Sequence, residues 1–510
     1  MLAQVDSSAI LGIDAHPVQV QVDVAFGNEK LIIVGLPDAA VKEAGERVRA
    51  AIKNSNFHFP SRKITVNLAP GDTKKVGPGF DLPIALGMLA ATGQVECTDL
   101  ADFVAVGELS LDGSLGPVCG VLPVALQARD AGRKALIVPT ANVAEATVVE
   151  GIAVYPVDSL YQAAELLQNP AARQPAPSRA GHWVLEEPIY DLDFSDVRGQ
   201  EHVKRALEVA AAGGHNLLMA GPPGSGKTML ARRLPTILPP LSMEEALEVT
   251  KVYSISGKLP PETALMTTRP FRAPHHTVSN AGLVGGGTIP RPGEISLSHY
   301  GVLFLDELPE FNHSALEALR QPLEDGMVTI SRAASSFTYP ARLMLVAAMN
   351  PCPCGFFGDS RKQCSCAHGQ IQRYLRRISG PLLDRIDIHI EVPRLAHDEI
   401  ITPAVSEPSA AIRQRVQHAR ERQGARFAGT HIFCNAHMQT RQLREFCRLG
   451  DTASGLLRDA IEHLSLSARA YDRILKLART AADLDASDEI MPAHVAEAVQ
   501  YRGLDRKLWG

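Results

Sequence analysis

Aromatic residues, net charge and long hydrophobic runs are all scarce in this 510-residue chain. Only 5% of the residues are aromatic, so base stacking is not expected to dominate any contact with nucleic acid. The formal net charge is −5, which does not by itself indicate a nucleic-acid-binding protein. No apolar run approaches the roughly 20 residues of a membrane span. The first residues also lack the basic start and long apolar core of a signal peptide.

These absences predict a cytoplasmic protein without a membrane contact. Disulfides are rare in the reducing cytoplasm, so we expect the eight cysteines to be thiols or metal ligands. The 45% of hydrophobic and 21% of charged residues are typical of a globular protein, and the length suffices for about three domains.

Positive charge is concentrated in one stretch, although the net charge is small. Residues 411–448 contain eight arginines and only two acidic residues. Such a stretch can be a solvated helix face or a surface that faces phosphates, and the sequence leaves both interpretations open. If it faces phosphates, Arg413, Arg415 and Arg420 are the first candidates for the contacts.

A glycine-rich segment has the pattern G-x-x-x-x-G-K-[ST], which binds nucleotide phosphates. Its residues are Gly221, Pro222, Pro223, Gly224, Ser225, Gly226, Lys227 and Thr228. The apolar run 216–220 before it predicts a buried strand, and residues 229–234 after it predict a helix. Backbone N–H groups at the start of such a helix attract phosphate oxygens. We expect Lys227 to reach the β- and γ-phosphates of ATP and the Thr228 hydroxyl to ligate Mg²⁺.

Two further apolar runs end in polar residues. Residues 302–305 are followed by Asp306 and Glu307, and residues 342–349 are followed by Asn350. We expect Asp306 to hold Mg²⁺ and Glu307 to polarise the attacking water, so the chain should hydrolyse ATP. Asn350 could hydrogen-bond the γ-phosphate, or it could form a turn before the following proline, and the strand alone does not decide.

Four of the eight cysteines form two C-x-C pairs that lie close together. They are Cys352, Cys354, Cys364 and Cys366. A structural zinc ion takes four thiolates in a tetrahedron, and two close pairs joined by a short loop can supply them. The C-x-C spacing is tighter than the usual C-x₂-C, and His368 could replace one ligand. The alternative is a set of reduced thiols in a flexible loop.

Hydrophobic periodicity predicts an α/β region, an ATP-binding region and a helical region. In the first region we expect strands at 18–24, 64–68, 135–138 and 153–157 and helices at 38–53 and 81–91. In the last we expect helices at 409–423, 440–449, 454–464, 467–484 and 492–501. A proline-rich stretch without apolar periodicity is typical of a linker. We therefore expect domains over 1–168, 187–398 and 399–510 and a linker at 169–186.

The order of these segments resembles that of AAA+ ATPases in the clade of magnesium-chelatase subunit I and the MCM helicases. The resemblance rests on the phosphate loop and on LFLDE (303–307), AAMN (347–350), GPLLDRID (380–387) and SARAYDRILKLARTAADL (467–484). The strings FRAPHHTVSNAGLVGGG (271–287) and NPCPCGFFGD (350–359) resemble the chelatase-like ComM/YifB family more closely, and the resemblance covers essentially the whole chain. It implies a Lon-protease-like (ribosomal S5-like) α/β domain, a central parallel AAA+ sheet and a C-terminal helical lid.

The resemblance also implies roles for further residues. Asn350 would read the γ-phosphate, Arg385 would be an arginine finger for the neighbouring subunit's ATP, and Arg469 would be the lid sensor. Val197 and Gly199 would line the adenine pocket. A guanidinium near the transferring phosphoryl group neutralises the charge on its oxygens. A finger given to a neighbour requires a ring, so the resemblance implies a homohexamer.

The Lon-like region lacks the residues needed for proteolysis. Gly79 stands where the nucleophilic serine would be, and residues 117–124 contain no lysine where one would be expected. Without a hydroxyl and a base there is no acyl-enzyme chemistry, so we expect a non-proteolytic scaffold or a DNA-facing module.

A histidine pair and a glycine run lie between the phosphate loop and Asp306. His275 and His276 could bind a metal, but adjacent imidazoles point apart on most backbones, so we expect loop residues instead. The resemblance implies that the segment with this pair and the glycine run 282–287, together with residues 288–298, faces the channel of the ring, where the glycines would permit a mobile loop.

The resemblance implies an ATP-driven DNA motor that promotes branch migration during integration of DNA by homologous recombination, as in natural transformation. It would contact branched or single-stranded DNA through the phosphates, and its other partners would be copies of itself and recombination proteins. A second hypothesis is a magnesium-chelatase-type motor that remodels a partner protein for metal insertion into a porphyrin. A third is a protein-remodelling ATPase without nucleic acid. Salt-sensitive binding of forked DNA would favour the first, and co-purification with a porphyrin-binding subunit the second.

Overall fold

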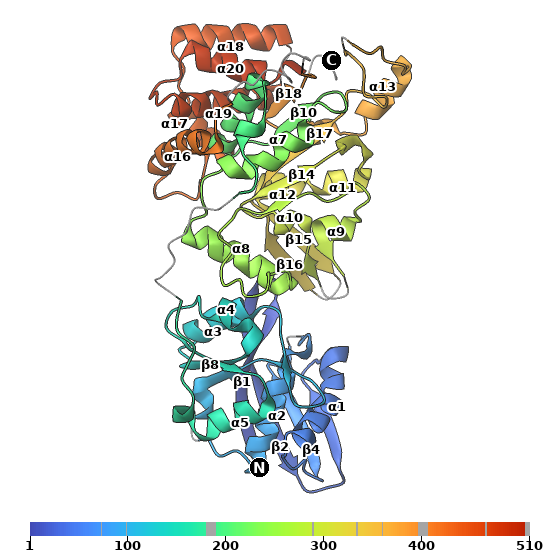
Figure 1. The fold of residues 1–510 in the computed structure, drawn as a ribbon, viewed down its shortest axis with the longest axis vertical. Helices are drawn as coiled ribbons and strands as arrows, with labels where there is room; N and C mark the ends of the chain where they lie inside the picture. The colour runs from blue at the N-terminus through green and yellow to red at the C-terminus, as the bar shows by residue number, and fades with distance from the viewer. Residues whose placement is uncertain are drawn as a thin grey trace.

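The computed structural model describes residues 1–72, 74–97, 99–179, 190–287, 290–332, 335–359, 361–395, 406–464 and 467–504. The molecule is elongated (Figure 1). The N-terminal sheet lies at one end, a second sheet occupies the middle, and the C-terminal helices form the other end. No described helix is long and apolar enough to cross a membrane.

Seven N-terminal strands form one mixed sheet in the order β3-β4-β2-β1-β5-β8-β9. Strand β2 pairs antiparallel with β1 and β4, and the other neighbours are parallel. The valines at 18, 20, 22 and 24 in β2 are all buried, as the alternation of the sequence predicts. The strands are β1 (Leu2–Leu11), β2 (Asp14–Ala25), β3 (Lys30–Val34), β4 (Lys63–Ala69), β5 (Phe103–Ala105), β8 (Ala135–Pro139) and β9 (Ala153–Val157).

Helices cover this sheet, and a short hairpin lies beside it. The helices are α1 (Ala39–Asn54), α2 (Asp81–Ala91), α3 (Val121–Asp130), α4 (Val143–Ala146) and α5 (Leu160–Gln168), and the hairpin is β6 (Glu108–Leu109) with β7 (Leu115–Gly116). The predicted strands and helices are present and the α/β class is confirmed. The sequence does not predict β1, because the buried Ser7 and Ser8 interrupt its apolar alternation.

The central sheet is wholly parallel and has the order β11-β14-β17-β10-β18. Every residue of β10, β14 and β17 is buried, as expected for parallel strands covered on both faces. Residues that follow these strands therefore meet at one edge of the sheet, where open α/β sheets bind ligands. The strands are β10 (Leu217–Ala220), β11 (Phe271–Arg272), β14 (Val302–Leu305), β17 (Met344–Met349) and β18 (Ile388–Glu391).

Nine described helices and two hairpins surround the central sheet. The helices are α6 (Glu201–Gly213), α7 (Lys227–Arg233), α8 (Met243–Ser256), α9 (Asn280–Val284), α10 (Glu294–Leu297), α11 (His313–Ala318), α12 (Arg320–Asp325), α13 (His368–Leu375) and α14 (Gly380–Leu383). The hairpins are β12 (Gly285–Gly286) with β13 (Arg291–Pro292), and β15 (Met327–Arg332) with β16 (Ser335–Pro340). The glycine run is thus part of α9 and β12. Gly285 has φ of +108°, and a Cβ there would lie 2.5 Å from the Arg291 carbonyl oxygen, so this pairing requires glycine.

The C-terminal region is helical, as predicted. It consists of α16 (Ser409–Arg426), α17 (Thr440–Phe446), α18 (Asp451–Leu464), α19 (Ala468–Leu484) and α20 (Pro492–Gln500). Apolar residues of α16 and α19 share one buried cluster with α6 and with strands β10 and β18, so the lid helices and the parallel sheet have a common core.

The arginines of α16 have partners within the chain. Arg415 pairs with Glu208 of α6 and with Glu407, and Arg420 donates to the Ala211 carbonyl oxygen at 3.0 Å. These contacts tie α16 to α6, because guanidinium groups satisfy buried carboxylate and carbonyl oxygens well. Arg415 and Arg420 therefore hold α16 in place, and their role as phosphate contacts stays a prediction.

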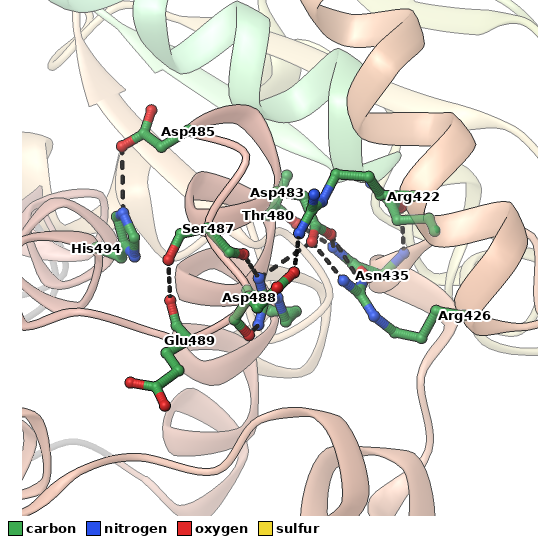
Figure 2. A network of polar contacts seen from close by, with 12 residues as sticks. Arg422, Arg426, Asn435, Thr480, Asp483, Asp485, Ser487, Asp488, Glu489 and His494 are labelled. Carbon is green, nitrogen blue, oxygen red and sulfur yellow. Dashed lines mark hydrogen bonds and ion pairs between the residues drawn. The ribbon is translucent and has the colours of Figure 1, made fainter.

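Further along α16, two arginines belong to the polar network of Figure 2. Arg426 donates to the buried Asp483 at 2.8 Å, and Asn435 Nδ2 donates to the same carboxylate at 2.8 Å. Arg422 pairs with Asp488 at the edge of the network. Asp483 thereby joins the end of α16 to α19.

Replacing Asp483 with Ala is expected to lower the free energy of unfolding by about 3–5 kcal/mol, the loss typical of a broken buried ion pair. The change leaves Arg426 and Arg479 without their shared carboxylate, whose side chain is 0% exposed. The control is Arg422→Ala, because its partner Asp488 is 94% exposed and such pairs contribute at most about 1 kcal/mol. Urea unfolding measures both, and equal losses would contradict the structural role of Asp483.

The N-terminal sheet is attached to the ATP-binding region through α3 and α8. Val121 and Leu122 share an apolar cluster with Leu241 and Ala246. Within the same contact Glu145 is buried and accepts a hydrogen bond from Ser254 Oγ at 2.6 Å. Burial raises the pKa of this carboxyl group. The contact between the N-terminal sheet and the ATP-binding region therefore combines apolar packing with a buried hydrogen bond.

The predicted domain boundaries stay predictions. Helix α5 ends at Gln168. The residues after it remain in contact with the N-terminal sheet, since the Ala176 N–H donates to the Val154 carbonyl oxygen. Residues 180–186 of the predicted linker and the boundary at 398–399 lie outside the described residues.

Candidate ATP site

The phosphate loop (residues 221–228) connects the end of β10 to the start of α7. Gly221 donates its N–H to the Met349 carbonyl oxygen at 3.2 Å, and a Cβ at Gly221 would lie 2.2 Å from the Val392 carbonyl oxygen. Gly224 and Gly226 have φ of +78° and +92°, which side chains disfavour. The glycines therefore allow the loop to lead directly to the N-terminus of α7, where N–H groups favour a phosphate.

Lys227 is buried in the first turn of α7. Its Nζ donates to the carbonyl oxygens of Gly221 and Pro222, at 2.8 and 3.0 Å, and to Asn350 Oδ1 at 3.2 Å. Burial lowers the pKa of Lys227, and two nearby carboxylates oppose the shift. The contact places the Asn350 amide beside the phosphate loop, which favours the γ-phosphate interpretation over a simple turn.

The predicted magnesium ligands are adjacent. Thr228 Oγ1 donates to Asp306 Oδ2 at 2.6 Å. A hydroxyl and a carboxylate at the phosphate loop are the oxygen ligands that Mg²⁺ takes in such sites, so the residues fit the ion. Glu307 follows with φ of +54° and a side chain that is 53% exposed.

His276 is a residue of this site that the sequence does not assign. Its Nδ1 lies 3.2 Å from Glu307 Oε2. The His275 ring lies against the His276 ring in a tilted arrangement, with the centroids 4.1 Å apart, and His275 Nδ1 hydrogen-bonds Thr277 Oγ1. Among the described residues, the cysteine cluster is the one group of three or more His, Cys, Asp or Glu side chains placed to hold a metal, and the histidine pair belongs to no such group. The one feature of the sequence that could have placed His276 in this site is the position of the histidine pair before Asp306.

The predicted adenine strip contacts the loop through Gln200. Val197 is fully buried and Gly199 has φ of +57°. Gln200 Nε2 donates to the carbonyl oxygens of Ser225 and Pro393, both at 2.9 Å. Gln200 Oε1 and Ser225 Oγ are buried without a hydrogen-bond partner among the described residues. Buried polar atoms are normally paired, so these two atoms fit a polar ligand such as a nucleotide.

The two predicted arginines lie together and away from the phosphate loop. They line a hollow of about 600 Å³ between α12, the residues that follow α14, the segment 431–439 and α19, and its described lining includes no residue of the phosphate loop. Arg385 donates to the Pro381 carbonyl oxygen at 2.7 Å and pairs with Glu324. Arg469 is 67% exposed and lies 3.4 Å from Asp384. Arg469 thus lines the same hollow as Arg385, and no phosphate-loop residue is among the described residues that line it.

The four cysteines converge directly after Asn350. Their sulfur atoms all lie within 4.8 Å of one another. Cys352 Sγ is 3.3 Å from Cys354 Sγ and 3.7 Å from Cys364 Sγ, and the last two are 3.6 Å apart. The C-x-C spacing therefore does not prevent convergence, and Cys366 supplies the fourth thiol.

Profiles of three protein families match the chain. "Magnesium chelatase, subunit ChlI" matches residues 193–400, "Subunit ChlI of Mg-chelatase" matches residues 20–142, and "Magnesium chelatase, subunit ChlI C-terminal" matches residues 406–502. The parallel sheet, the phosphate loop and the adjacent Asp306 and Glu307 agree with these matches. The fold and site define an AAA+ ATPase of the magnesium-chelatase type, a class that uses ATP and Mg²⁺.

Proteins that are similar over the whole chain define the family more closely. The chain is 46% identical to the uncharacterized protein YifB of Escherichia coli K12 and 45% identical to the competence protein ComM of Haemophilus influenzae Rd, and each match covers 99% of this chain and 98% of the relative. Lon protease 2 of Bacillus subtilis is 31% identical over 29% of this chain and 28% of its own length. The chain belongs to the YifB/ComM family.

Proposed function

We propose that this chain is an ATP-driven DNA motor that forms a homohexameric ring and promotes branch migration, so that incoming DNA is integrated by homologous recombination. The observation that supports a ring is the hollow lined by Arg385 and Arg469. No phosphate-loop residue of the same chain is among its described lining, so these arginines would act on the ATP of a neighbouring subunit. The relative ComM is named for competence, which supports a role with DNA. The motor would act in the cytoplasm on branched or single-stranded DNA, together with recombination proteins.

In this proposal the loop residues bind ATP. The backbone from Gly221 to Gly226 cradles the phosphates, and Lys227 leaves its carbonyl partners to contact the β- and γ-phosphates. Thr228 and Asp306 hold Mg²⁺, which when bound neutralises charge on the phosphate oxygens. The strip with Val197 and Gly199 lines the adenine pocket, where Gln200 Oε1 offers an acceptor.

Hydrolysis uses Glu307 and Asn350 from the same subunit. Glu307 accepts a proton from the attacking water, and Asn350 orients that water or the γ-phosphate. The contact between His276 and Glu307 holds the carboxylate until the histidine moves. His276 lies in the segment that the family resemblance places at the ring channel, so DNA there could release Glu307.

Arg385 and Arg469 act on the neighbouring subunit. Each would leave its present acidic partner, Glu324 or Asp384, and contact the neighbour's γ-phosphate. One subunit then senses the nucleotide of the next, and hydrolysis around the ring becomes movement. The front domain is a scaffold or a DNA-facing module, because Gly79 has no hydroxyl for proteolysis.

We also propose one structural zinc ion at Cys352, Cys354, Cys364 and Cys366. Zn–S bonds of about 2.3 Å in a tetrahedron place the sulfur atoms roughly 3.8 Å apart. The three Sγ separations of 3.3, 3.7 and 3.6 Å are close to that value. Metal analysis of protein purified without chelator should find about one zinc per chain, and the double variant Cys352→Ser/Cys354→Ser should lose it. A wild-type chain without zinc would contradict the site.

A second candidate is a chelatase-type motor that remodels a partner protein for metal insertion. The matches to magnesium-chelatase subunit profiles favour it. The same arginine and phosphate-loop geometry would serve either motor. Binding to DNA therefore separates the two.

The deciding experiment is ATP-dependent strand displacement on synthetic three- and four-stranded branched DNA, with Glu307→Gln as the inactive control. We expect the wild type to move the branch and the variant to bind without moving it. Binding should weaken steeply as salt rises, because phosphate contacts release counterions. A wild type that neither binds nor moves the DNA would favour the chelatase-type motor.

A further inference from the structure

The cysteine loop, residues 351–367, lies against the phosphate loop. It leaves the sheet after Asn350 and ends at the start of α13. Gly355 has φ of +84°, and a Cβ there would lie 2.6 Å from Pro223 Cδ. The turn that follows Cys354 therefore packs directly on the phosphate loop, and a side chain at Gly355 would push the two apart.

Arg394 joins the same two loops from the other side. Its Nη2 donates to the Pro223 carbonyl oxygen at 3.2 Å, and its Nε lies 3.7 Å from Asp359 Oδ2. The guanidinium also lies over the Phe356 ring, 5.2 Å from its centroid, and Lys362 Nζ lies 4.1 Å from the same centroid. Because the guanidinium hydrogen-bonds one loop and pairs with a carboxylate of the other, it holds the two loops at a set distance.

The described part of the cysteine loop has no regular secondary structure, and it meets the apolar core mainly through its cysteines. None of its described residues belongs to a helix or strand, and most are exposed or half-buried. Cys352 is fully buried, and the other three thiols pack around it. A loop without a hydrogen-bonded ladder is held in one conformation when a metal ties its ends together, as in small zinc-dependent folds.

We propose that the four-cysteine site is a brace for the phosphate loop, so that metal occupancy sets the affinity for nucleotide. With zinc bound, Gly355 and Arg394 keep Pro223 in place and the loop is preformed for phosphates. Without zinc, the cysteine loop must be ordered whenever a nucleotide binds, and that cost weakens binding. The inference rests on the proposed ATP and zinc sites and adds a coupling between them.

Calorimetric titration of the full-length protein with ADP tests the coupling. Affinity is measured with zinc bound, after a chelator has withdrawn the zinc, and after zinc is restored. We expect a loss of at least about tenfold and its recovery, which excludes irreversible unfolding as the cause.

A variant that spares the cysteines gives a second test. Arg394→Ala should keep its zinc and lose about tenfold in ADP affinity, the effect of one charge-assisted hydrogen bond. Arg361→Ala removes the same charge from an exposed site in the cysteine loop and should bind ADP as the wild type does.

The outcomes separate the proposals. ADP affinity that is independent of zinc, or an Arg394→Ala variant that binds normally, overturns the brace and leaves both sites intact. A wild-type chain that holds no zinc overturns the zinc site and the brace with it. A zinc-loaded wild type that does not bind ADP overturns the ATP site instead.

Discussion

Glu307→Gln is expected to lower ATP turnover by about 10²- to 10⁴-fold, the usual contribution of one general base, while ATP still binds. The glutamine amide keeps the size of the side chain but cannot accept a proton from water. Binding should persist because Thr228 and Asp306, the proposed magnesium ligands, and Lys227 are unchanged. A coupled phosphate-release assay measures turnover, and a fluorescent ATP analogue measures binding.

Glu310→Gln is the matched control, because this glutamate lies three residues further along and pairs with Arg377 at 2.6 Å. It should retain turnover. Lys227→Ala should show the opposite pattern to Glu307→Gln, namely weak nucleotide binding, since the ammonium is lost from the phosphate loop. Normal turnover in Glu307→Gln would remove this residue as the water activator, and unchanged ATP affinity in Lys227→Ala would contradict the phosphate-loop assignment.

Arg385→Ala is expected to lower ATP hydrolysis by about 10³- to 10⁵-fold, as for other arginine fingers, without breaking the ring. The guanidinium has the Pro381 carbonyl oxygen and Glu324 as its partners, and its Nε is buried without a partner among the described residues. The side chain is therefore not needed to complete its own ATP site. Size-exclusion chromatography with light scattering checks that the hexamer remains.

Mixing variants tests whether the arginine acts on a neighbour. In a mixed ring of Arg385→Ala and Lys227→Ala subunits, some interfaces combine an intact Arg385 from a Lys227→Ala subunit with an intact phosphate loop from an Arg385→Ala subunit. Part of the activity should therefore return. A ring of Arg385→Ala and Arg469→Ala subunits is the control. Both defects lie on the same side of the subunit, so no contact is intact and no activity should return. Equal recovery in the two mixtures would contradict a shared site.

The secondary structure was largely predictable because its signals are local. The alternating valines of β2 and the uninterrupted apolar runs of β10, β14 and β17 each determine a strand within a few residues. Strand β1 was not predictable, because its buried serines hide the alternation. The glycine run 282–287 is predicted to permit a mobile loop, which stays a prediction, and its Gly285 and Gly286 pair closely with Pro292 and Arg291.

The distribution of charge along the sequence was the least reliable predictor of a binding surface. The arginines of residues 411–448 could form a solvated face or a surface for phosphates, and in the structure Arg415, Arg420 and Arg426 contact acidic residues or carbonyl groups of the same chain. Their partners come from α6 and α19, which are remote in the sequence. A cluster of charge in the sequence therefore shows nothing of which charges remain exposed.

By itself the sequence determined the family, the phosphate loop, the strand that ends in Asp306 and Glu307, and the two cysteine pairs, because contiguous motifs carry them. Only the tertiary structure decided which distant groups meet. It placed His276 at Glu307, Gln200 at the phosphate loop, Arg469 in the same hollow as Arg385, and Gly355 on Pro223. The contacts of His276, Gln200 and Gly355 exist because parallel strands bring their carboxyl ends to one edge and the loops must pack there. Arg385 instead precedes β18, so the hollow that it lines with Arg469 lies at the amino ends of the strands.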